Sequence, residues 1–169
     1  ARVEPIVDLA PGAESSTLGR FFAERIRTNL GDPRAKATFR ALKATVFVVG
    51  FDSGDAATLR FDHGRLTVHE GTIGMPTVTF GGPERALLSL DRVRLRDLGD
   101  SLLGERAGVA LVESRERRLS SIPPPSSRRS NRMELRELLR LLAQGELKIY
   151  GWLAHPRTVV RFLRLIARS

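Results

Sequence analysis

The chain has 169 residues, of which 41% are apolar and 28% are charged, so it is long enough and apolar enough for one domain with a hydrophobic core. No stretch approaches the roughly 18 consecutive apolar residues of a membrane-spanning helix. Arg2, Glu4 and Asp8 interrupt the first residues, so we expect no signal peptide. Cysteine is absent, which excludes disulfides, cysteine-ligated zinc and thiol catalysis and favours a cytoplasmic protein.

The formal net charge is +9, and all but three of the 28 basic residues are arginine. A positive charge of this size favours contact with anionic lipid surfaces, nucleic acid or acidic partners. It gives no information about the fold.

The N-terminal part of the sequence predicts two helices. Residues 1–14 contain two prolines and a glycine and are expected to form an extended lead-in. Apolar residues at helical spacing predict a helix over 17–30, for which the serine pair 15–16 offers the N-cap. Asp32 is expected to cap a second helix over 33–43, which has proline at its first position.

The apolar pattern then changes to a period of two. Strands are predicted at 44–51, 58–61, 65–69 and 77–80, separated by segments rich in Gly, Asp, Ser and Pro. Such turn chemistry predicts an antiparallel meander. The alternation of apolar and polar residues gives this sheet one apolar face.

The second half of the sequence is less regular at first. A short helix is predicted at 83–90, and residues 91–130 follow no single period. We interpret 91–130 as an inserted segment. Its part 115–130 is rich in Arg, Ser and Pro, and that composition is typical of a flexible loop.

Three further elements complete the predicted domain. A leucine-rich helix follows Asn131, a fifth strand covers 146–150, and an amphipathic helix covers 156–168. The fold class predicted from the whole pattern is α+β. A single domain over 15–169 would contain a mainly antiparallel five-stranded sheet with helices on one face.

Three sequence motifs occur together. A hairpin reads F-x-x-G-x-L from Phe61 to Leu66, a strand after a proline turn reads P-T-V-T-F from Pro76, and the fifth strand reads G-E-L-K-I-Y-G over 145–151. This combination resembles the sterol-carrier-protein type-two domain. The resemblance covers roughly 34–90 and 131–168, and the motif at 145–151 is its most specific part.

The resemblance implies that the fifth strand closes the sheet and the last helix closes a tunnel for lipid. The chain would then bind or transfer a lipid-like hydrophobic molecule, without catalysis and without a cofactor. Independently, the predicted helices carry more apolar surface than a small sheet needs, and the surplus could form the wall of a cavity. The predicted ligand-binding residues are Phe80, Leu87, Leu138, Leu142, Leu147, Ile149, Trp152, Phe162 and Ile166.

Two features depart from the family pattern. The insert at 91–130 lies where the family's ligand helices are expected. Trp152 follows Gly151 at a position where relatives often carry a small or polar residue, so its indole could fill part of the tunnel.

The last predicted helix also carries a basic stripe. Arg157, Arg161, Arg164 and Arg168 share the face opposite the apolar one. Such a stripe either keeps the helix in solvent or contacts an anionic membrane surface.

Two alternatives to lipid binding remain open. The first is an accessory or scaffold domain that keeps this fold with a filled cavity and acts through protein–protein contacts. The second is nucleic-acid binding through the Arg-rich insert, which is less favoured because 115–132 contains no aromatic residue for base stacking.

No catalytic or metal site is predicted. The three histidines, His63, His69 and His155, have no metal-ligand spacing, and the serines lie in caps or loops. The sequence predicts no oligomeric state.

Overall fold

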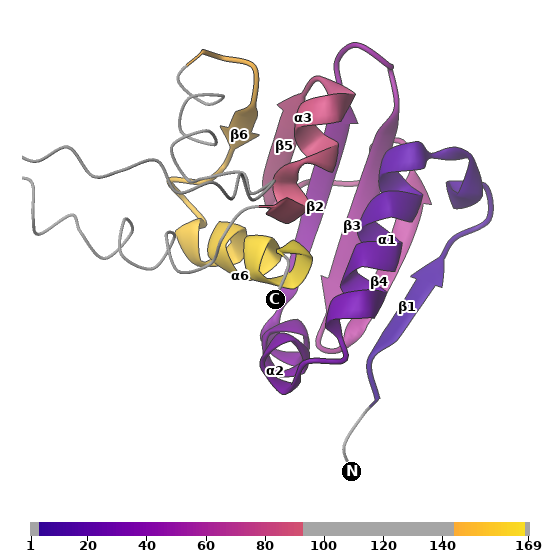
Figure 1. The fold of residues 1–169 in the computed structure, drawn as a ribbon, viewed down its shortest axis with the longest axis vertical. Helices are drawn as coiled ribbons and strands as arrows, with labels where there is room; N and C mark the ends of the chain where they lie inside the picture. The colour runs from indigo at the N-terminus through magenta and orange to yellow at the C-terminus, as the bar shows by residue number, and fades with distance from the viewer. Residues whose placement is uncertain (1–3, 93–143, 168–169) are drawn as a thin grey trace, which may run out of the picture.

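The computed structural model describes residues 4–92 and 144–167 (Figure 1). The predicted helix after Asn131, nearly all of the predicted insert, Leu138, Leu142 and Arg168 lie outside these residues. In chain order the described elements are β1 (Ile6–Leu9), a 3₁₀ turn (Ala13–Ser15), α1 (Thr17–Asn29), α2 (Pro33–Ala41), β2 (Lys43–Gly50), β3 (Ala56–Asp62), β4 (Arg65–Glu70), β5 (Val78–Gly82), α3 (Glu84–Leu88), a second 3₁₀ turn (Leu90–Arg92), β6 (Lys148–Tyr150) and α6 (Pro156–Ile166).

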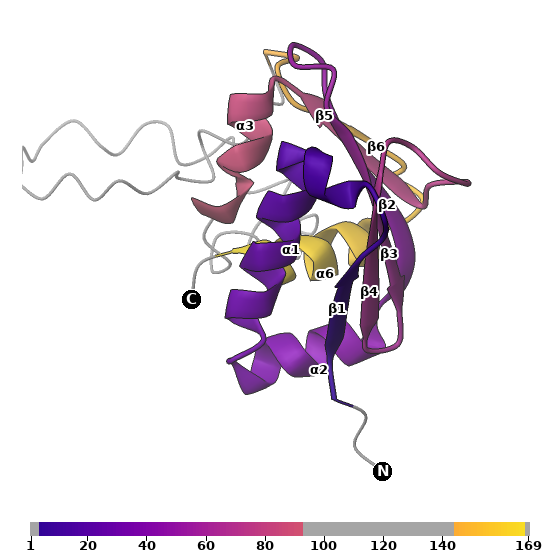
Figure 2. The same ribbon diagram turned by 90° about the vertical axis from the view of Figure 1, so that its right-hand side faces the viewer.

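The fold class is the predicted one: an α+β domain with helices on one face of a mainly antiparallel sheet. The described strands form one sheet of six, in the order β1-β4-β3-β2-β5-β6. Figure 2 shows the four labelled α-helices on the same side of this sheet. We call the face toward the helices the inner face and the other the outer face.

The sheet has one strand more than predicted. β1 lies within the segment that we expected to be an extended lead-in, and it pairs in parallel with β4, with Ile6 opposite Arg65. This strand has only four residues between two prolines, Pro5 and Pro11, which is too short for an alternating pattern to be recognised.

The predicted meander is correct for β2, β3 and β4 but wrong for β5. β5 does not continue beside β4; it pairs in parallel with β2, with Val78 opposite Val46. The connection 71–77 therefore crosses the sheet, and it does so on the outer face (Figure 2). Thr58 fixes it there, because its hydroxyl donates to the carbonyl of Gly71 (2.7 Å) and accepts from the N–H of Ile73 (2.9 Å).

Polar side chains cap the starts of α1 and α2. The predicted N-caps are confirmed: Ser16 Oγ accepts from Gly19 N (2.9 Å), and the carboxylate of Asp32 accepts from the first turn of α2. Asp55, which is distant from α1 in the sequence, also caps this helix, because its Oδ2 accepts from Leu18 N (2.8 Å). Each bond satisfies a helix N–H that has no partner within its own helix.

Five buried phenylalanines run through the core between the sheet and the helices. The ring of Phe162 lies 5.0 Å from that of Phe80, 5.8 Å from Phe22 and 6.2 Å from Phe61, and Phe61 in turn lies 6.0 Å from Phe39. These tilted and edge-on contacts have the geometry that aromatic pairs favour. Among the residues described, no helix is long and apolar enough to cross a membrane.

The Thr58 hydroxyl gives a test of this topology. The substitution Thr58→Val should lower the free energy of unfolding by about 1–3 kcal/mol, because it leaves the Gly71 carbonyl and the Ile73 N–H without their partner. Thr67→Val is the matched control, since Thr67 lies on the outer face of β4 opposite Arg60. Urea unfolding that shows equal stability for the two variants would contradict the role given to Thr58.

Candidate functional site: the interior beneath the C-terminal helix

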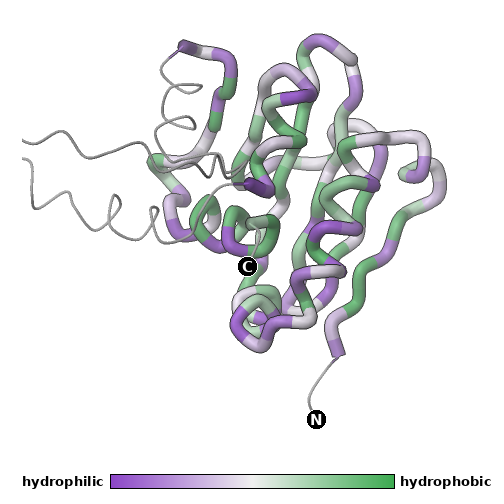
Figure 3. The backbone as a smooth tube through the Cα atoms, in the orientation of Figure 1, coloured by the Kyte–Doolittle hydropathy of each residue, from purple (hydrophilic) through white to green (hydrophobic). Residues whose placement is uncertain are grey.

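The last helix, α6, has one strongly apolar face. It begins with Pro156 at its first turn, where proline needs no N–H partner. Hydrophobic and hydrophilic residues alternate along it (Figure 3). The apolar side chains that it buries are Val159, Phe162, Leu163, Leu165 and Ile166. Among them, Phe162 lies against Phe80 of β5 and Phe61 of β3 on the inner face.

The structure places six of the seven described residues that were predicted to bind ligand in or against the apolar core. They belong to, or directly precede, four elements: Phe80 on β5, Leu87 on α3, Leu147 and Ile149 at β6, and Phe162 and Ile166 on α6. Ile149 lies directly opposite Phe80 across the β5–β6 pair. All six belong to the core cluster or pack against it.

Gly82 allows the chain before β6 to approach β5 closely. A Cβ at this position would lie 2.6 Å from the backbone oxygen of Glu146 and 3.4 Å from the side chain of Leu147. Only glycine fits here without a shift of the backbone. The close approach places Leu147 against the interior, where it is 1% exposed.

Trp152 does not join this set. It lies in the turn after β6, where its side chain is 48% exposed, and the adjacent Leu153 is 78% exposed. We expected that its indole could fill part of the tunnel, but the structure places it on a turn with about half of its surface in solvent.

The basic stripe of α6 is divided between two environments. Arg157 and Arg164 are exposed. Arg161 is half-buried, and its Nη1 donates to the carbonyl of Ala41 at the end of α2 (3.2 Å). Arg161 therefore helps to attach α6 to α2, and only two of the three described arginines are exposed.

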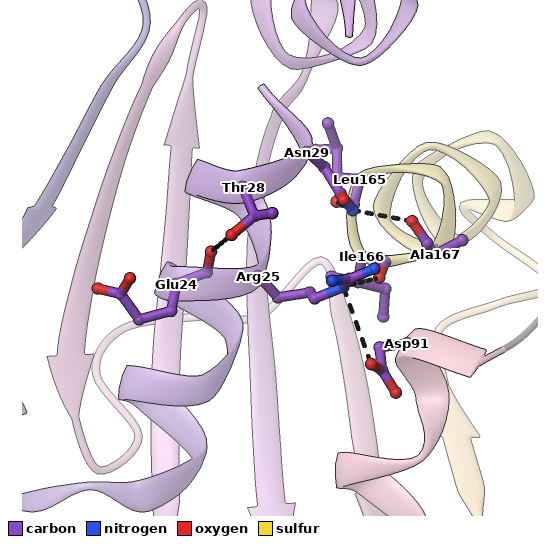
Figure 4. A network of polar contacts seen from close by, with 8 residues as sticks. All are labelled: Glu24, Arg25, Thr28, Asn29, Asp91, Leu165, Ile166 and Ala167. Carbon is purple, nitrogen blue, oxygen red and sulfur yellow. Dashed lines mark hydrogen bonds and ion pairs between the residues drawn. The ribbon is translucent and has the colours of Figure 1, made fainter. Parts of the chain in front are cut away.

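Side chains from α1 hold the C-terminal end of α6. Asn29 Nδ2 donates to the carbonyls of Leu165 (2.7 Å) and Ala167 (2.8 Å), and Arg25 Nε donates to that of Ile166 (3.1 Å), as Figure 4 shows. The last carbonyls of a helix have no partner within the helix, and no glycine follows α6 to form a C-cap. We call this group of bonds the α6 latch.

Asp91 connects the latch to the segment after α3. Its Oδ2 lies 3.8 Å from Arg25 Nε, and its side chain is 4% exposed. A buried carboxylate requires compensating partners, so the contact with Arg25 is part of the packing and not a surface ion pair. No pattern in the sequence predicted the roles of Asn29, Arg25 and Asp91. The available signal was a final helix that lacks a C-terminal glycine cap.

A separate groove lies on another part of the surface. It has a volume of about 400 Å³ and is lined by Glu4, Pro5, Val7, Arg27, Leu30, Gly31 and Lys36. None of the predicted ligand-binding residues takes part, and three of its lining residues are charged. An open and charged groove of this kind does not fit an apolar ligand.

Across the described ranges 4–92 and 144–167, no group of three or more His, Cys, Asp or Glu side chains could hold a metal ion. His63 is the residue of the β3–β4 turn with a positive φ of 44°, and it precedes Gly64 with a φ of 102°. The pair forms the tight turn that the sequence predicted.

Comparison with known proteins supports the fold and leaves the family open. No protein-family model matches the chain, and no curated protein matches its sequence. A solved structure described as "UbiJ-SCP2 Ubiquinone synthesis protein" is similar, with a TM-score of 0.53 and 15% identity over 88% of this chain and 91% of that one. The chain therefore has a fold like that of the sterol-carrier-protein type-two domain.

The α6 latch gives the second prediction. Asn29→Ala removes two hydrogen bonds and leaves two backbone carbonyls buried without a donor, so we expect a loss of about 2–3 kcal/mol in the free energy of unfolding. Thr28→Ala is the control, because the exposed Thr28 hydroxyl bonds only within its own helix. Faster amide exchange in α6 should accompany the loss in the Asn29 variant alone. Unchanged exchange there would show that the latch does not hold the helix.

Proposed function

We propose that this protein binds a lipid-like hydrophobic molecule, without catalysis, in the interior bounded by β5, β6, α3 and α6. The observation that carries the proposal is the convergence of Phe80, Leu87, Leu147, Ile149, Phe162 and Ile166 from these elements. The similar fold of the sterol-carrier type supports the same choice of site.

The chemistry of the interior suits an apolar ligand with little directional recognition. The buried polar or charged residues of the described chain are Ser16, Asn29, Thr58 and Asp91. The first three are used by hydrogen bonds of the caps, the latch and the β4–β5 connection, and Asp91 contacts Arg25. Binding would then rest on apolar burial, at about 25 cal/mol per Å².

α6 is the element that we propose to move for ligand entry. It is the last described helix, and its C-terminal carbonyls are held by side chains of α1. Opening the interior on this side requires the release of these bonds and of the Arg161 bond to Ala41. The latch thus sets part of the free energy of opening.

The name of the similar structure suggests the first ligands to test. That protein is described as a ubiquinone synthesis protein, so an isoprenoid quinone is a suitable probe beside a long-chain fatty acid and a phospholipid. An accessory role in which the interior is filled by side chains is the alternative, and it predicts no uptake of any of the three. The nucleic-acid alternative predicts binding with a steep salt dependence instead.

The third prediction uses the alternation of β6. Ile149 faces the interior opposite Phe80, whereas Tyr150, opposite Thr79, faces the other side of the sheet. Ile149→Trp should fill the interior and lower ligand uptake at least about tenfold, whereas Tyr150→Trp should leave it unchanged. Uptake is measured with delipidated protein in vesicle-free solution, by displacement of a fluorescent fatty acid.

Native mass spectrometry of the purified wild-type protein supplies an independent measurement. A co-purified lipid that is lost in Ile149→Trp but kept in Tyr150→Trp would support the site. Equal uptake by both variants would place the ligand elsewhere, and no uptake by the wild type would favour the filled interior.

A further inference from the structure

The exposed apolar side chains of the described chain are concentrated in one place. Seven large hydrophobic side chains are exposed, and five of them lie on the connection 71–77 or on 150–153. The exposed fraction reaches 90% for Met75 and 78% for Leu153. We call this group the apolar tip; its members are Ile73, Met75, Tyr150, Trp152 and Leu153.

The two segments of the tip adjoin through the backbone. Tyr150 pairs with Thr79, so the turn after β6 lies beside the start of β5. Gly151 has a φ of 82°, and a Cβ there would be 2.6 Å from the carbonyl oxygen of Thr77. Figure 2 shows the connection between β4 and β5 projecting from the sheet on the side away from the helices.

Positive charge flanks the segment 150–153 of the tip. Neither 71–77 nor 150–157 contains an acidic residue. Lys148 precedes the turn on β6 and Arg157 follows it at the start of α6, and both side chains are exposed. The segment 150–153 is thus flanked by two positive charges, whereas Glu70, exposed at the end of β4, precedes the connection 71–77.

We propose that the apolar tip docks into the interfacial region of an anionic lipid bilayer. A tryptophan and a tyrosine beside apolar side chains suit the boundary between headgroups and acyl chains. The flanking Lys148 and Arg157 complement anionic headgroups, and the same charges on a second copy of the chain would repel each other. The docking rests on the proposed function for its purpose, because a carrier must meet a membrane to exchange its ligand.

The chain supplies its own reporter for this docking. Trp152 is its only tryptophan, so intrinsic fluorescence reports on the tip alone. Vesicles of phosphatidylcholine and phosphatidylglycerol in equal parts should shift the emission to shorter wavelength, and brominated acyl chains should quench it. Vesicles of phosphatidylcholine alone should give a much smaller change.

Variants that keep the reporter test the tip directly. The double substitution Met75→Ser and Leu153→Ser removes two exposed apolar side chains and should weaken partitioning into the anionic vesicles at least about tenfold. Ile6→Ser is the matched control, because Ile6 is exposed on β1 at the opposite edge of the sheet. Circular dichroism checks that both variants are folded.

Three outcomes would overturn the proposal. Vesicle binding without a change in Trp152 emission would assign docking to another surface. Equal partitioning of the double variant and the wild type would show that the tip is not the membrane-docking surface. A blue shift that grows with protein concentration in the absence of vesicles would show that the tip binds a second copy of the chain instead. Ligand uptake measured without vesicles separates the docking proposal from the ligand-binding proposal. The double variant should retain ligand uptake if the tip serves docking alone.

Discussion

The fold depends on the contact between the last helix and a sheet built mainly from the first half of the chain. Phe162 of α6 lies against rings from α1, β3 and β5, so one side chain joins three elements that are distant in sequence. Without α6, Phe80 and Phe61 would lose their contact with Phe162 on the inner face of the sheet. Removal of a buried aromatic side chain is among the most destabilising changes in a core. The proposed site, and the helix that we propose to move for ligand entry, are therefore also part of the core.

This dual role explains why the end of α6 is held by side chains. A helix that closes an apolar interior must leave its final carbonyls near the protein body, where water cannot satisfy all of them. Asn29 and Arg25 supply the donors from α1, and Asp91 balances the charge of Arg25. Bonds of this kind are specific in geometry but modest in net free energy, so they can hold the helix without making its release prohibitive.

Local signals in the sequence predicted the local structure well. The caps at Ser16 and Asp32 and the hairpin turn at His63 depend on residues only a few positions apart, and the structure contains all of them. The parallel pairing of β5 with β2 could not be predicted, because alternation defines which face a residue occupies but not which strand lies beside it. The same limit applies to the latch, whose donors and acceptors are more than a hundred residues apart. The burial of Phe80, Leu87, Leu147, Ile149, Phe162 and Ile166 could be predicted because burial on a strand or helix face is a periodic signal. The exposure of Trp152 could not, because it depends on a turn.

The short strand β6 connects the two surfaces to which we assign functions. Its alternation directs Ile149 to the inner face opposite Phe80 and Tyr150 to the outer face opposite Thr79. Gly82 and Gly151 permit the close approach of the chain at either end of this strand, since a Cβ at either glycine would meet a backbone oxygen at 2.6 Å. A shift of one residue in the β5–β6 register would exchange the two faces and bury Lys148 in place of Leu147 or Ile149. The two glycines therefore constrain the interior and the exposed tip together, and the G-E-L-K-I-Y-G segment contributes to both through one strand.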